Sequence, residues 1–353
     1  MICGVLGLDA RAARYTWTVV FVLSLAAIAY LIRETLFLFV LALLFAYLLW
    51  PLVDFLDQRL PGQTRVPALS IVYVALIGLL ILVGIQVGTR VVQQANALAT
   101  KVPELLAKLQ QPTAVAVDST FQGRIFSFLR DEIISHSRDL VALLPQAVLG
   151  ILSHTGVLLY IVLVPILSFF FLKDGRAILA DFLGILAGRA RREIAEEILS
   201  DIHLLLARYM RALVLLALVA FVAYGSFLSI LGAPYSILLA AITFPLELIP
   251  ILGPVTAAII ILLVTGLSGF DHLLWILSFL GAFRIFQDYV LSPRLLSAGM
   301  ELHPLMIVFG VIAGSQIAGI AGTFLSVPAL AIIRIIYRQL QLSRHRTPGA
   351  AAV

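Results

Sequence analysis

The chain alternates between long apolar runs and shorter polar segments. A helix needs about 20 apolar residues to cross a hydrocarbon core of about 30 Å, and eight runs approach or exceed that length. Because lipid offers backbone groups no hydrogen-bond partners, these runs are predicted to be helices, or broken helices enclosed by protein. Six runs have ordinary length and two are longer; in chain order the eight are 15–32, 36–53, 66–88, 148–172, 212–231, 235–266 (long), 273–291 and 305–333 (long).

Two segments are polar enough to leave the membrane. Residues 90–146 mix charged and apolar side chains, which predicts amphipathic helices broken near 112–120. Residues 173–208 end in a clearer amphipathic helix, where Arg192 and Glu196 are spaced to pair at i, i+4. The predicted organisation is 1–89 (three membrane helices), 90–147 (extracytoplasmic amphipathic segment), 148–172 (fourth membrane helix), 173–208 (cytoplasmic amphipathic segment), 209–340 (C-terminal transport core with the two long runs) and 341–353 (cytoplasmic tail).

The amino-acid composition strongly favours an integral membrane protein over a soluble one. Of the 353 residues, 62% are hydrophobic and 12% are charged, against about 25% charged in a soluble domain. The predicted fold is therefore an all-α polytopic membrane protein with about eight membrane segments, two of them broken or re-entrant, plus amphipathic helices. Cys3 is the only cysteine, which excludes an intrachain disulfide. The net charge of +5 is spread along the loops, so we expect the lipid bilayer as a partner and no nucleic acid.

The distribution of basic residues predicts the orientation. With eight crossings, the short loops and termini on one side hold fourteen Lys and Arg residues and those on the other hold two. The positive-inside rule therefore places both termini of the multi-pass protein in the cytoplasm. Arg11 and Arg14 precede the first run as in a signal peptide, but no small-residue cleavage site follows. We expect an uncleaved first span.

The two long runs carry the strongest indication of function. Residues 235–266 would extend about 48 Å as one helix, yet Pro245, Pro250 and Pro254 interrupt them. Residues 305–333 contain Gly319 and Gly322 near their midpoint. Paired, interrupted hydrophobic segments indicate a transport site, because freed carbonyls and half-helix ends can bind ions or polar solutes at mid-depth. The alternative is that the same residues only permit kinks and close helix packing.

A sharper hypothesis makes both long runs re-entrant hairpins, one opening to each face, with residues 273–291 crossing between them. The termini then stay inside, so the charge distribution does not separate this topology from eight full spans. Cysteine accessibility at Ile251 and Ala321 does separate the two.

Few ionisable residues fall within the runs. Glu247 lies between two prolines of the first long run and is the leading candidate for a proton- or cation-carrying group; capping freed backbone donors is the alternative role. Arg284 and Asp288 are spaced as an i, i+4 ion pair with Gln287 beside them, either structural or lining a polar path. The full set of candidate transport-path residues is Glu247, Pro250, Gly253, Pro254, Arg284, Asp288, Gly319 and Gly322.

Sequence motifs for other chemistry are missing. The chain has no HExxH, P-loop or dinucleotide fingerprint, and no Ser–His–Asp grouping stands out. We therefore expect no enzyme, no metal site and no cofactor, and ATP-driven transport would require a separate subunit.

Seven motifs in order resemble those of the autoinducer-2 exporter (AI-2E) family, from about residue 36 to 336. They are ALLFAYLLWPLVD at 42–54, FFFLKDG at 169–175, LGAPY at 231–235, IPILGP at 249–254, DYVLSPR at 288–294, LHPL at 302–305, and GIAG at 319–322 with Val327 and Pro328. The resemblance implies an eight-segment permease of the bacterial inner membrane, a homo-oligomer such as a pentamer, and export of small solutes or transport driven by ion gradients.

The resemblance leaves the substrate open. Members of the family have been linked to export of the signal autoinducer-2 and to sodium/proton antiport. This sequence also departs from the family pattern, with Arg211-Ala-Leu213 where many members have Arg-Gly-Gln, and Ser297 where many have glycine. The expected function is a secondary transporter or exporter of a small solute or signalling molecule. The alternatives are a monovalent cation (Na+ or Li+)/proton antiporter and a non-transporting membrane scaffold or sensor.

Overall fold

The computed structural model describes residues 10–60, 64–110, 155–186, 188–296 and 303–346. Every regular element in this part of the chain is a helix, which confirms the predicted all-α class. Cys3, the predicted break near 112–120 and the start of the 148–172 run lie outside the described residues. The helices are α1 (Ala10–Leu31), α2 (Arg33–Asp57), α3 (Val66–Val83), η1 (Gly84–Gly88), α4 (Thr89–Gln110), α6 (Thr155–Ile185), α7 (Arg189–Ile230), α8 (Ser236–Glu247), α9 (Leu252–Leu267), α10 (Leu273–Phe286), η2 (Gln287–Leu291), α11 (Ser292–Leu296) and α12 (Pro304–Arg346).

Within the described residues, six helical stretches are long and apolar enough to cross a membrane. Two further helices, α8 and α9, are apolar but shorter. Large apolar side chains such as Phe21, Leu79 and Ile230 lie exposed on the outer faces of the helices. Such surfaces are tolerated in lipid and not in water, so the polytopic membrane fold is established.

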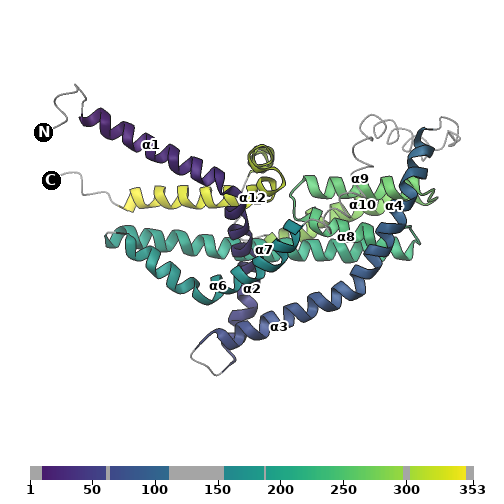
Figure 1. Cartoon of the computed structure of the whole chain (residues 1–353), viewed down its shortest axis with the longest axis horizontal. Helices are drawn as coiled ribbons and strands as arrows, with labels where there is room; N and C mark the ends of the chain where they lie inside the picture. Colours follow the sequence, from purple (N-terminus) through teal and green to yellow (C-terminus); the bar gives the residue numbers. More distant parts are fainter. Residues whose placement is uncertain (1–9, 61–63, 111–154, 187, 297–302, 347–353) are drawn as a thin grey trace.

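Several helices continue from a membrane run into a neighbouring polar segment. The helices α3, η1 and α4 follow one another without a break, forming the curved rod that Figure 1 shows rising beside α8. Helix α7 combines the amphipathic segment with the fifth predicted span in 42 residues. On its polar side Arg192 Nε lies 3.0 Å from Glu196 Oε1, so the predicted i, i+4 pair is confirmed. The predicted membrane and peripheral parts are therefore joined by continuous helix rather than by loops.

The first long run is broken, as its prolines predict. Helices α8 and α9 contain 12 and 16 residues, about 18 and 24 Å, so neither reaches across a core of about 30 Å. The chain turns at Ile251, whose φ of 67° is unusual for a β-branched residue. At Gly253 an added Cβ would overlap the carbonyl oxygen of Leu246, so only glycine allows the two half-helices to approach this closely.

The second long run is also broken, and it folds back on itself. The helical geometry of α12 is lost at Ala318 and at Gly319, where φ is 58° and ψ is −136°. Beyond this point the second arm returns along the first, because a Cβ on Gly314 would overlap the carbonyl of Gly322 and the reverse also holds. The break thus lies at the first residue of the predicted Gly319–Gly322 stretch, and the arms touch through backbone.

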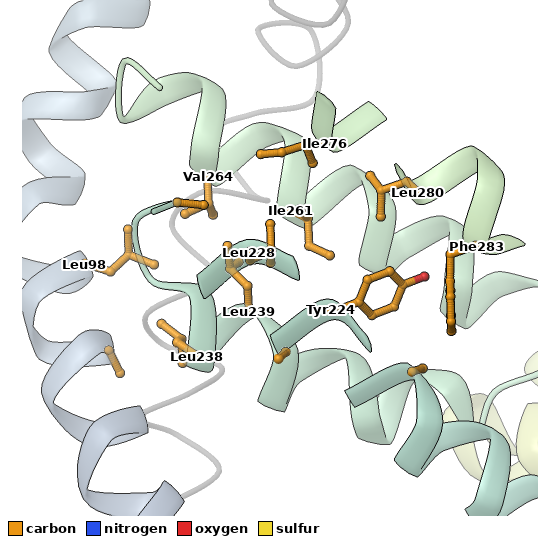
Figure 2. Close-up of a cluster of buried hydrophobic side chains, with 14 residues drawn as sticks. Leu98, Tyr224, Leu228, Leu238, Leu239, Ile261, Val264, Ile276, Leu280 and Phe283 are labelled. Carbon is orange, nitrogen blue, oxygen red and sulfur yellow. The ribbon is translucent and has the colours of Figure 1, made fainter. Parts of the chain in front are cut away.

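Two apolar clusters hold these hairpins. The first joins α4, α7, α8, α9 and α10, and Figure 2 shows Leu228, Leu239, Ile261 and Ile276 meeting at its centre. The second joins α2, α7 and the second arm of α12, and Leu248 from the turn after α8 packs against it. Figure 1 shows α7 passing through both regions. The long helix α7 is therefore the common support of both broken segments.

The backbone contact at Gly314 and Gly322 predicts a stability effect. Gly322→Ala should lower the melting temperature of the detergent-purified protein, since the new Cβ meets a carbonyl that can move only with its helix. Overpacking of this kind typically costs about 1–3 kcal/mol. The measurement is thermal unfolding, followed by intrinsic fluorescence or by loss of the monodisperse peak in size-exclusion chromatography.

Gly78→Ala is the matched control. Nothing lies within 4 Å of a Cβ at Gly78 in α3, and alanine is favoured over glycine in a helix by up to about 1 kcal/mol. This variant should melt at or slightly above the temperature of the unaltered protein. Equal melting temperatures for the two variants would contradict the close contact in α12.

Candidate functional site

Glu247 is the last residue of α8, at the break of the first hairpin. The helix ends here because Pro250 lacks the N–H that would bond to the carbonyl of Leu246. That carbonyl instead accepts a hydrogen bond from the N–H of Ile249, at 2.9 Å. The resulting tight turn leaves Glu247 pointing into the protein, where it is only 5% exposed.

Gln287 is the contact partner of Glu247. Its Nε2 donates a hydrogen bond to Oε1 of Glu247, across a sequence separation of 40 residues. Gln287 is 3% exposed and is the first residue of η2, a short π-helical turn that continues α10. Turns of this kind are often found at functional sites, because the extra residue changes the direction of neighbouring side chains.

Each member of this pair keeps one buried oxygen without a hydrogen-bond partner. Oε2 of Glu247 and Oε1 of Gln287 are both enclosed by protein, and no donor from the described residues reaches either. A buried carboxylate held by a single amide N–H is poorly compensated, since buried polar groups are normally satisfied and buried charges paired. Acceptor oxygens without donors can be satisfied by a proton on the carboxylate or by a small cation.

Arg284 and Asp288 form the outer part of the same site. Arg284 Nε lies 2.8 Å from Asp288 Oδ2, and the two side chains are 40% and 45% exposed. The predicted i, i+4 ion pair is therefore confirmed. Both charges lie close enough to Glu247 to interact with it electrostatically. The site thus has a buried carboxylate–amide pair and, beside it, a more accessible guanidinium–carboxylate pair.

Aromatic side chains border the polar cluster. Tyr224 of α7 lies with its ring centroid 5.1 Å from that of Phe283 and 5.9 Å from that of Phe279. Figure 2 shows Tyr224 and Phe283 together at one end of the apolar cluster described above. Apolar surroundings of this kind lower the local dielectric and strengthen interactions among Glu247, Arg284 and Asp288.

Pro250, Gly253 and Pro254 shape the turn of the hairpin. The carbonyls of Ile249 and Pro250 accept hydrogen bonds from Gly253 and Leu252, at 3.0 and 2.7 Å. These carbonyls are therefore partly used within the turn, although each retains a second lone pair. Oε2 of Glu247 and Oε1 of Gln287 are unpartnered side-chain acceptors beside this turn, whereas the sequence pointed to backbone carbonyls, whose role stays a prediction.

Gly319 and Gly322 belong to the second hairpin. Their geometry is explained by the bend and by the contact with Gly314. The two hairpins are linked through apolar packing, because Leu248, next to Glu247, contacts the cluster that contains Val327 of α12. The structure thus brings Glu247, Arg284 and Asp288 together, adds Gln287 to them, and places the glycine break on a separate element.

Comparison with known proteins identifies the family. The family model described as the AI-2E family transporter matches residues 19–341. The chain is 26% identical over 300 residues to the putative transport protein YueF of Bacillus subtilis, covering 81% of this chain and 79% of the relative. It is 29% identical over 302 residues to the putative transport protein MT0215 of Mycobacterium tuberculosis, with 82% and 79% covered.

A further relative is described as a permease. The chain is 25% identical over 307 residues to the putative permease PerM of Escherichia coli K12, and the alignment covers 84% of each chain. The family match spans both broken segments and every residue of the site built by Glu247, Arg284, Gln287 and Asp288. On this match, which extends over nearly its whole length, the chain belongs to the AI-2E family of transporters.

Proposed function

We propose that this protein is a secondary transporter that exports a small solute or signalling molecule across the bacterial inner membrane, with Glu247 holding the coupling proton or monovalent cation. One observation carries the proposal: Glu247 and Gln287 form a buried pair with two unpartnered oxygens. An ionisable residue within the membrane is costly to bury and is a functional group by default. The position of Glu247 at a helix break fits the usual place of coupling ions in transporters.

The pair suits two alternative occupants. A deprotonated Glu247 and the Oε1 atom of Gln287 supply oxygen ligands, which hard cations prefer. A protonated Glu247 can donate its own hydrogen bond to an amide oxygen, because the amide of Gln287 carries both a donor and an acceptor. Alternating occupation by a proton and a cation at one site couples their movements.

A second candidate follows from the same oxygens. If the monovalent cation is itself the cargo, the protein is a Na+ or Li+/proton antiporter and no organic solute is required. The buried Glu247–Gln287 pair favours antiport, since it offers oxygen ligands for a cation and no further group that would recognise an organic molecule. The exposed Arg284–Asp288 pair favours a polar solute instead.

The proposed orientation has both termini in the cytoplasm and the two hairpins opening to opposite faces. The half-helices α8 and α9 are each too short to cross the membrane, which supports a re-entrant first hairpin. The backbone contact between the arms of α12 supports the same arrangement for the second. Assembly into a homo-oligomer is part of the proposal and would cover some of the exposed apolar helix surface.

Glu247→Gln should abolish cation-dependent proton movement in proteoliposomes containing the purified protein. The glutamine cannot ionise and so can neither release a proton nor balance a cation. The measurement is the recovery of the fluorescence of a pH-sensitive dye on addition of sodium or lithium chloride.

Gln287→Ala should retain transport but raise the half-saturating cation concentration about tenfold or more, since a hydrogen bond to a charged group contributes about 1.5–3 kcal/mol. The same dye assay measures this concentration.

Glu34→Gln is the control for this experiment. Glu34 is exposed in the first turn of α2, so the variant should respond to sodium and lithium as the unaltered protein does. Proton movement that persists unchanged in Glu247→Gln would dismiss the coupling role.

Cysteine labelling tests the proposed topology. The variants Ile251→Cys and Ala321→Cys are made in a Cys3→Ser background and treated with an impermeant maleimide, which reaches only the outer face of a vesicle. One variant should react in inverted vesicles and the other in right-side-out vesicles. Arg176→Cys, expected in the cytoplasm, calibrates the orientation of the vesicles. Labelling of both hairpin positions from one face would refute the opposed arrangement.

A further inference from the structure

Arg284 is the permanent positive charge next to the proposed coupling site. It lies on α10 one turn before Gln287, the residue that contacts Glu247. Its Nε is paired with Asp288 at 2.8 Å, and the two side chains are about half exposed, so neither is locked by packing. An arginine side chain keeps its charge under all ordinary conditions and offers five N–H donors.

Two carboxylates therefore compete for one guanidinium. Asp288 holds Arg284 in the structure, while Glu247 has an oxygen without any donor. When Glu247 carries neither a proton nor a cation, its negative charge is buried beside a single amide N–H, which is an unfavourable state. Rotation of the Arg284 side chain from Asp288 to Glu247 would relieve it, because Asp288 is 45% exposed and loses less by giving up its partner than the buried Glu247 does.

We propose that Arg284 is an internal counter-ion that moves between Asp288 and Glu247. It pairs with Asp288 while Glu247 is occupied, and it pairs with Glu247 when the site is empty. This inference rests on the proposed coupling role of Glu247 and adds a residue that regulates occupation of that site. It explains why an ion pair stands beside the carboxylate rather than an apolar surface.

The exchange makes Arg284 a competitor of the transported cation. The apparent affinity for sodium is the intrinsic affinity multiplied by the fraction of molecules in which Glu247 is free. If Arg284 is paired with Glu247 in about nine molecules out of ten, the apparent affinity falls about tenfold. Arg284→Gln should therefore tighten sodium binding about tenfold. Asp288→Asn should weaken it by a similar factor, since Arg284 then has only Glu247 as a partner.

The double variant separates exchange from simple electrostatics. If Arg284 and Asp288 acted only as fixed charges near the cation, their effects would be independent and would cancel in Arg284→Gln/Asp288→Asn, restoring the original affinity. If Arg284 exchanges, Asp288 matters mainly through Arg284. The double variant should then bind sodium almost as tightly as Arg284→Gln, about tenfold more tightly than the unaltered protein. It also removes both members of the pair together, so neither Arg284 nor Asp288 is left without its partner.

The experiment measures equilibrium binding of radioactive sodium to the purified full-length protein in lipid nanodiscs at one fixed pH. Arg192→Gln and Glu196→Gln are the controls, since these residues form an i, i+4 pair of similar geometry and exposure on α7; their sodium affinity should be unchanged. Opposite shifts in the single variants, with a double variant resembling Arg284→Gln, support the exchange.

Two results would overturn the exchange alone. One is a double variant with the original affinity, and the other is a shift in the same direction, or none, for both single variants while the unaltered protein binds sodium through Glu247. Absence of sodium binding by the unaltered protein, with Glu247→Gln behaving identically, would reject the proposed cation coupling and the exchange together. The two kinds of failure are thus distinguishable.

Discussion

Every backbone N–H and C=O group in the hydrocarbon region needs a partner within the protein. That constraint produces helices wherever the chain is apolar, and it makes each interruption of a helix a structural problem to be solved locally. In the first hairpin, Pro250 withholds a donor from the carbonyl of Leu246, and the N–H of Ile249 replaces it at 2.9 Å. The turn stays short, and Gly253 gives the two half-helices room to meet.

The second hairpin satisfies the same constraint by different means. No proline lies at its bend; Gly319 supplies a backbone conformation that side chains with a Cβ rarely adopt. The arms then approach at Gly314 and Gly322, where the missing side chains let backbone meet backbone. Close packing of this type replaces the hydrophobic effect, which does not drive helices together in lipid. Both hairpins thus depend on residues that lack either a side chain, as the glycines do, or a backbone N–H donor, as Pro250 does.

The sequence predicted the helices and their breaks because both follow from local chemistry. Run length and proline position determine where a helix is needed and where it fails, so the interruptions near Pro250 and Gly319 were predictable. The contact between Gln287 and Glu247 was not, because it depends on how α10 packs beside α8 and on the π-helical turn that begins at Gln287. Positive φ at Ile251 was equally hidden, since a β-branched residue gives no local signal for it. The only sign of this contact in the sequence was the amide of Gln287 beside Arg284 and Asp288.

The lipid constraint also gives the site its chemistry. The buried hydroxyls of Thr243 and Thr265 donate to carbonyls of the preceding turn and are satisfied without any ligand, whereas the buried hydroxyl of Tyr209 has no partner among the described residues. Glu247 has no such local solution, because a carboxylate accepts hydrogen bonds and the backbone donors one turn back are already used by the helix. Its charge must be met from another element or by a bound ion. The amide of Gln287 meets half of that need, and Arg284 is engaged by Asp288. A buried carboxylate with only one hydrogen-bond donor is unfavourable for a residue with a purely structural role. It suits a group that binds and releases a proton or a cation in each transport cycle.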